Sequence, residues 1–146
     1  MSHVAFFIFV LVASFFWAMM EIQIEGKDGW AAALPTWRYK IYLKYIWERE
    51  ITGYHFFLMS FILVLLHSVF IFFPWTIGIE FRILAFFLIL GVIEDFLWFI
   101  LNPAFGLKKF NRIEVPWHSM WFLGIPTFYW VFLPLGFFLY SISLTL

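Results

Sequence analysis

Two adjacent acids, Glu94 and Asp95, are the residues of this sequence best placed to do chemistry, because they interrupt an apolar segment long enough to cross a membrane. A carboxylate near the bilayer centre costs about 2.5–3.5 kcal/mol on insertion scales, so two of them need a compensating partner. If residues 91–103 form a helix, Trp98 and Asn102 share a face with the acids. Both side chains can donate hydrogen bonds, and we expect them to bond to the ligands of a site and fix the orientation of those ligands.

Three more ionisable residues lie near the ends of other apolar segments: Glu21, His55 and His118. Carboxylates and imidazoles together form a ligand set that suits zinc, iron or manganese better than copper(I), so the sequence predicts one or two divalent metal ions. Glu94 and Asp95 are also the predicted catalytic residues, with Asp95 as a ligand or general base. The predicted ligands are Glu21, His55, Glu94, Asp95 and His118.

Two other ionisable residues are expected to lie outside this site. Glu25 follows Glu21 by one helical turn, and we interpret it as a solvated acid at a helix end. His67 lies about 18 Å from His55 along the same predicted helix, which is too far for one coordination sphere.

Other chemistries also fit these residue types. A network of carboxylates and protonated histidines, or carboxylates sharing a proton, would suit a proton or ion path. The same groups could serve only to pair helices. Haem is not expected, because the carboxylates beside His55 and His118 are unusual neighbours for it. The sequence contains no Glu-x-x-His, His-Glu-x-x-His, Gly-x-Ser-x-Gly or phosphate-loop motif that would decide among these.

The composition identifies the bilayer as the solvent of this chain. Of its 146 residues, 65% are hydrophobic and only 12% are charged, more apolar surface than a soluble domain of this size can bury. The formal net charge of zero argues against a nucleic-acid partner. The absence of cysteine excludes disulfides and thiolate ligands.

The hydrophobic runs predict an all-α integral membrane four-helix bundle that forms a single transmembrane domain. Pro126 and Pro134 fall inside the last run, so we expect that helix to be kinked. The bilayer surrounds the bundle, and its apolar surface leaves room for a homo-oligomer. The predicted spans cover about residues 3–22, 51–73, 81–101 and 118–144.

Between the first two spans, residues 37–49 combine aromatic side chains with Lys40 and Lys44. The two lysines are one helical turn apart, and Thr36 is a suitable N-cap residue. We therefore expect a short amphipathic helix lying along the cytoplasmic membrane surface.

The basic residues predict an orientation. Eight of the nine Lys and Arg lie in loops 23–50 and 102–117, and only Arg82 lies elsewhere. The positive-inside rule places both loops in the cytoplasm and both termini outside it. Counting residues from the cytoplasmic end of each span, at about 1.5 Å per residue, then places the predicted ligands of all four spans in the cytoplasmic third of the bundle.

Together these features predict a small integral membrane enzyme with a metal site near the cytoplasmic interface. It would hydrolyse or oxidise a lipid-like or otherwise hydrophobic substrate. One alternative is a proton- or cation-coupled transporter or channel subunit that uses Glu94 and Asp95. A second is a non-catalytic membrane assembly subunit whose polar cluster only fixes helix register.

The topology can be tested directly. Reporters fused to either terminus should give extracytoplasmic signals, and a reporter inserted at Lys108 should give a cytoplasmic one, because the charge bias is eight to one. A cytoplasmic signal from the C-terminus would contradict the predicted orientation.

Overall fold

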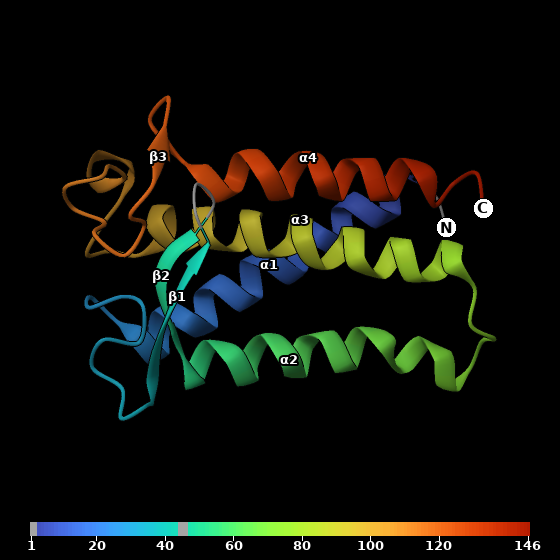
Figure 1. Ribbon diagram of the computed structural model, residues 1–146, viewed down its shortest axis with the longest axis horizontal. Coiled ribbons are helices and arrows are strands. Elements are labelled where there is room, and N and C mark those ends of the chain that lie inside the picture. Colours follow the sequence, from blue (N-terminus) through green and yellow to red (C-terminus); the bar gives the residue numbers. More distant parts are fainter. Residues whose placement is uncertain (1–2, 44–46) are drawn as a thin grey trace.

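The computed structural model describes residues 3–43 and 47–146, and these are mostly helical (Figure 1). The helix α2 continues as the short 3-10 helix η1 (Ser68–Ile71), and a second one, η2 (Leu107–Lys109), follows α3. Three helical segments are long and apolar enough to cross a membrane: α1, α2 with η1, and α3. The four α-helices are α1 (His3–Glu25), α2 (Gly53–His67), α3 (Ile77–Leu101) and α4 (Thr127–Ile142).

Threonine caps begin two of these helices. Thr52 Oγ1 accepts a hydrogen bond from the backbone N–H of His55 at 3.2 Å, and Thr76 Oγ1 accepts one from that of Ile79 at 3.1 Å. Each cap satisfies a backbone donor that has no partner inside its helix. The C-cap of α3 is Asn102, whose position before a proline disfavours helical backbone.

The fourth span differs from its prediction. The helix α4 begins at Thr127 rather than near residue 118, and at 16 residues it is shorter than each of the three segments that could cross a membrane. Leu123 and Gly124 have positive φ angles, and they close a small hairpin of β3 (Trp121–Phe122) and β4 (Ile125–Pro126) ahead of the helix. Pro126 therefore caps α4 instead of kinking it, since proline fits the start of a helix.

The interfacial helix predicted for residues 37–49 is wrong. Strands β1 (Arg38–Leu43) and β2 (Trp47–Thr52) form an antiparallel pair, and residues 44–46 lie outside the described part of the chain. Tyrosine, isoleucine, tryptophan and threonine favour strands, and polar and apolar residues alternate from Arg38 to Ile41. The four-residue spacing of the two lysines fits a period of two as well as a helical turn, which explains the error.

Opposite charges support this pairing. Lys40 lies directly across from Glu50, and the guanidinium of Arg38 is 3.9 Å from the Glu50 carboxylate. The fold is therefore mostly helical, with three segments long and apolar enough to cross a membrane, and it also carries two small two-stranded sheets.

The helix α3 is the centre of the packing. Both α1 and α4 lie along it, whereas α2 makes few contacts with the other helices. Gly136 of α4 allows the closest approach, because a Cβ built there would lie 2.6 Å from Cγ1 of Ile89 on α3. The largest core cluster includes Phe6, Val10, Phe86, Ile89, Leu90 and Tyr140.

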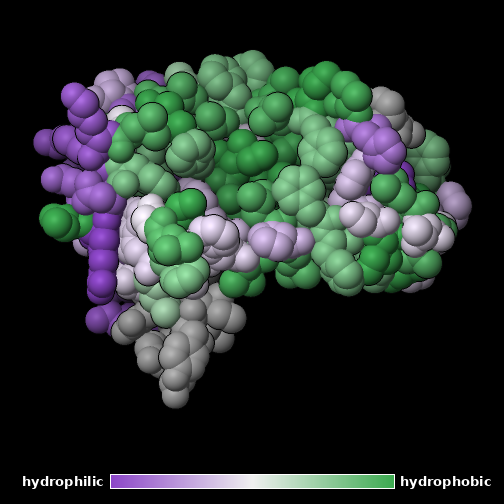
Figure 2. Space-filling view, turned by 90° about the horizontal axis from the view of Figure 1, so that it is seen from above, coloured by the Kyte–Doolittle hydropathy of each residue, from purple (hydrophilic) through white to green (hydrophobic). Residues whose placement is uncertain are grey.

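The two ends of the molecule differ in polarity. Figure 1 places both termini at one end and the loops 26–37 and 102–120 at the other. Hydrophilic residues gather at that loop end in Figure 2, while hydrophobic residues cover most of the middle. Exposed side chains of the middle include Phe16, Phe57 and Phe61, as expected for a surface in contact with lipid.

The close approach of α3 and α4 gives a matched pair of glycine substitutions. Gly136→Ala should lower the free energy of unfolding by about 1–3 kcal/mol, because the new methyl group overlaps Ile89. Gly91→Ala is the control: a Cβ there meets no atom within 4 Å, so helix propensity should leave stability unchanged or about 0.5–1 kcal/mol higher. Unfolding in mixed detergent measures both, and equal effects would contradict the packing described.

Candidate functional site

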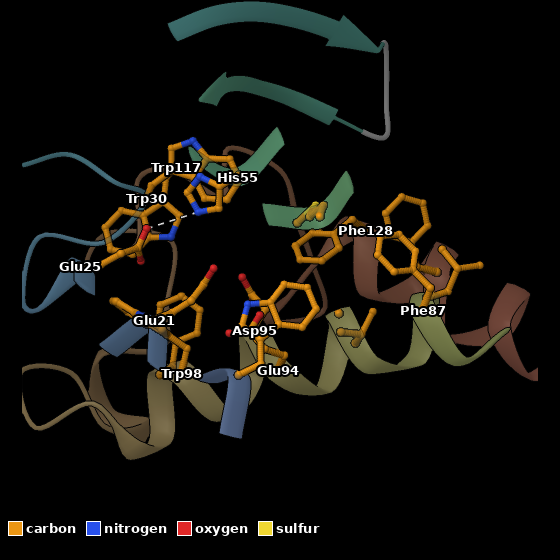
Figure 3. Close-up of a pocket in the computed structure, with 17 residues that line it drawn as sticks. Glu21, Glu25, Trp30, His55, Phe87, Glu94, Asp95, Trp98, Trp117 and Phe128 are labelled. Atoms are coloured by element: carbon orange, nitrogen blue, oxygen red, sulfur yellow. Dashed lines mark ion pairs between the residues drawn. The ribbon is translucent and has the colours of Figure 1, made fainter. Parts of the chain in front are cut away.

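Four of the five predicted ligands line one cavity at the loop end of the bundle. The cavity holds about 810 Å³ when the space at its open mouth is counted. Figure 3 shows Glu21, Glu94 and Asp95 lying together, with His55 near Glu25. His118 is the fifth predicted ligand, and it contacts Asp95.

A buried ion pair joins α1 to the start of α2. His55 Nε2 lies 3.3 Å from Glu25 Oε1, and both side chains are almost fully enclosed. His55 Nδ1 is 2.6 Å from Thr52 Oγ1, so the residue that caps α2 also orients the imidazole ring. Glu25 Oε1 accepts a hydrogen bond from the backbone N–H of Ala31 at 2.5 Å.

The loop after α1 covers this pair with an indole. Trp30 stacks on the His55 ring at a centroid distance of 3.8 Å, and its Nε1 donates to the carbonyl of Glu50 in β2 at 2.7 Å. Arg38 in β1 donates to the carbonyl of Ala31. The hairpin that replaces the predicted interfacial helix thus holds Trp30 over the imidazole.

Glu21 lies one turn before Glu25 and joins it to the acids of α3. Its carboxyl group contacts the side chains of Glu94 and Trp17. Glu94 is itself buried, and its Oε1 has no hydrogen-bond partner among the described residues.

Asp95 belongs to a second group, which links α3 to α4. Asp95 Oδ2 accepts a hydrogen bond from the hydroxyl of Tyr129 at 2.5 Å and lies 3.1 Å from Nε2 of His118. The backbone carbonyl of His118 accepts a hydrogen bond from Trp121 Nε1 at 2.5 Å. The β3–β4 hairpin therefore fixes the position of the histidine.

The two residues predicted to support the ligands have different places. Trp98 lines the cavity, and its buried Nε1 has no hydrogen-bond partner among the described residues. Asn102 does not line it: its Nδ2 donates to the carbonyl of Gly26 at 2.7 Å, and its Oδ1 accepts from the N–H of Ala104. Asn102 therefore joins the loop after α1 to the end of α3 instead of supporting a ligand.

Sequence reasoning missed three residues of the site. Glu25 is buried rather than solvated, and its spacing from Glu21 could have indicated this, since both lie on one face of α1. Trp30 and Tyr129 carry no comparable signal, because their contacts depend on loops whose conformation the sequence pattern does not reveal.

His67 lies at the other end of α2. Its Nε2 is 3.1 Å from Glu80 Oε1, and its Nδ1 is 2.7 Å from the carbonyl of Leu63. Arg82 is also remote from the cavity, and it donates to the carbonyl of Ser143 at 3.0 Å. Both lie outside the acidic cluster, as the spacing of the sequence predicts.

Glu21, Glu25 and His55 could hold a metal ion. Each offers a buried ligand atom, and these atoms lie within 4.8 Å of one another. Glu94 and Asp95 add two more carboxyl groups to the same cavity, whose described lining contains neither lysine nor arginine.

The fold and the site define a mostly helical protein with three segments long and apolar enough to cross a membrane and an acidic, histidine-containing cavity at one end. Comparisons with protein-family models, with curated proteins and with solved structures give no match.

The hydrogen bond between Tyr129 and Asp95 can be tested by stability. Tyr129→Phe should lower the free energy of unfolding by about 1.5–3 kcal/mol, because it removes a short bond to a carboxyl group. Tyr39→Phe, at a side chain that is 69% exposed, should change it by less than about 0.5 kcal/mol. Equal stability of the two variants in detergent would show that the bond contributes nothing.

Proposed function

We propose that Glu21, Glu25 and His55 bind a divalent metal ion, zinc, iron or manganese, and that the protein is a metal-dependent membrane hydrolase acting on a hydrophobic substrate. The distance of 3.3 Å between His55 Nε2 and Glu25 Oε1 carries this proposal. Two ligands of a tetrahedral ion with bonds of about 2.0–2.1 Å lie about 3.3–3.4 Å apart.

A hydrogen bond explains this distance less well than a shared ion. A charge-assisted bond between an imidazolium and a carboxylate is usually about 2.7–2.9 Å long. If His55 Nδ1 donates its proton to Thr52 Oγ1, then Nε2 presents a lone pair to Glu25. Two lone pairs facing each other in a buried place require a cation between them.

The charges of the cavity support the same proposal. Four carboxyl groups, from Glu21, Glu25, Glu94 and Asp95, face one cavity with a single imidazole in its described lining. Burying that much negative charge without compensation is strongly unfavourable. A divalent ion would offset part of it, and Glu94 is available as a fourth ligand through its unpaired Oε1.

Asp95 is better suited to proton transfer than to metal binding. Tyr129 and His118 both hold its Oδ2, which orients the carboxyl group at the cavity wall. A metal ion held by Glu21, Glu25 and His55 would supply Lewis acidity, and Asp95 would accept a proton from the water that adds to a substrate carbonyl carbon. The bond to the leaving oxygen or nitrogen then breaks, and that atom takes the proton.

Hydrolysis is favoured over the other functions by what surrounds the cluster. It requires only water as co-reactant. A proton path would have to continue past the apolar core cluster of Phe6, Phe86 and Ile89. We place the cluster at the cytoplasmic side, because the loops beside it carry eight of the nine basic residues.

Metal content tests the proposal. Full-length protein purified with zinc, iron and manganese supplied should contain about one metal ion per chain by elemental analysis. Glu25→Gln and His55→Gln should each reduce metal affinity by at least about tenfold, because each removes one ligand. His67→Gln is the matched control, because that histidine pairs with Glu80 at the other end of α2, and its metal content should equal that of the wild type.

Two outcomes would overturn the proposal. One is wild-type protein without stoichiometric metal after such a purification. The other is equal loss of metal from His67→Gln and His55→Gln, which would indicate a general effect on folding. Thermal melting of each variant identifies that effect independently.

A further inference from the structure

We infer that the cavity binds an uncharged single-chain amphiphile, with its ester or amide group at the acidic cluster and its hydrocarbon chain between α2 and α4. The inference rests on the proposed hydrolase in one respect: the ester or amide is the bond that would be cleaved. Its binding evidence stands apart from the metal.

Two buried polar atoms without hydrogen-bond partners indicate which polar groups the ligand must carry. Trp98 Nε1 is a donor without an acceptor among the described residues, and Glu94 Oε1 likewise has no partner. Both side chains line the cavity, at 4% and 6% exposure. Buried polar groups of this kind are normally satisfied, so a ligand that supplies a carbonyl oxygen and a hydroxyl or N–H group fits them.

Charge selects against anionic lipids. A phosphate or carboxylate headgroup needs basic side chains or backbone donors, and the described lining contains neither lysine nor arginine. The four carboxyl groups around the cluster would repel such a headgroup. An uncharged polar end carries no such penalty.

The rest of the cavity is suited to a hydrocarbon chain. Figure 3 shows Phe87 lying away from the acids, on the far side of Phe128. From Asp95 back to Phe87 the helix α3 rises about 12 Å, which gives an apolar wall directed toward the centre of the bundle. Met59 on α2 and Phe132 on α4 complete this wall.

The packing of α2 suggests how a chain enters. Only Gly53 and His55 of α2 are buried, and the helix makes few contacts with its neighbours, whereas α4 packs along α3. Met59 and Phe132 nevertheless line the same cavity. A lipid chain can therefore reach this space from the bilayer, between α2 and α4, without passing through water.

Photolabelling of the full-length protein in nanodiscs tests the inference. The probe is a monoacylglycerol, an uncharged ester, with a diazirine midway along its chain. Peptide mapping should find the label on residues 87–88, Met59 and Phe132. The matching fatty acid and lysophosphatidic acid, with the same chain and diazirine, should label these sites at least about tenfold less.

Two substitutions separate cavity binding from general lipid contact. Gly91 lines the cavity and has open space beyond its Cα, so Gly91→Leu should fill the cavity and abolish the label at Met59 and Phe132. Ala5→Leu adds comparable bulk to an exposed position of α1 and should leave the labelling unchanged.

A third substitution tests the polar end. Trp98→Phe keeps an aromatic ring but removes the N–H donor, so it should weaken labelling by the ester probe about threefold to tenfold. Melting of the ligand-free variant should be unchanged or higher, because an unsatisfied buried donor is removed. A purely structural role of Trp98 would instead lower the melting temperature.

The experiment distinguishes failure of this inference from failure of the proposed function. Labelling is measured both with zinc supplied and after chelation, since the cavity wall does not depend on the ion. Equal labelling by charged and uncharged probes, or labelling that Gly91→Leu leaves intact, would overturn the inference whatever the metal content. Specific labelling of a wild type that contains no metal even after purification with zinc, iron and manganese supplied would support the inference and contradict the hydrolase.

Discussion

The cost of enclosing carboxylates in a bilayer governs this structure. Three helices are apolar enough to cross a membrane, yet α1 and α3 between them bring Glu21, Glu25, Glu94 and Asp95 into one cavity. Such charges are tolerated only where partners face them, so neighbouring elements supply imidazoles, a phenol and indoles. The polar partners come from the loops and helix ends, and the hydrophobic packing occupies the remainder of the bundle.

This constraint explains how much could be predicted from the sequence. Hydrophobic runs identified the helices, because a membrane span requires a long apolar segment with few exceptions. Insertion cost and residue counting predicted that Glu21, His55, Glu94, Asp95 and His118 lie near one another. In the structure four of them line one cavity, and His118 contacts Asp95. The sequence pattern does not give the direction in which each side chain points around its helix axis. That direction decides that His55 faces Glu25 while His118 faces Asp95.

The errors have one physical origin: the local sequence is compatible with two different structures. Residues 38–43 pair with residues 47–52 as strands because β-branched and aromatic residues outweigh a lysine spacing that suited a helix equally well. The start of α4 was misplaced because a proline that opens a helix and one that kinks it look alike in sequence. At α4 the turn at Leu123 and Gly124 sets where the helix begins, and the sequence pattern alone does not reveal that turn.

The contact between Glu25 and His55 also has a consequence for chain entropy. It closes a loop of 30 residues, counted as 55 minus 25, that contains the whole β1–β2 hairpin. Closing a flexible loop of that length costs about 3 kcal/mol by the logarithmic term alone. Whatever strengthens this contact therefore also restrains the hairpin, which lies outside the helices. The hairpin and the buried contact between Glu25 and His55 therefore share one equilibrium.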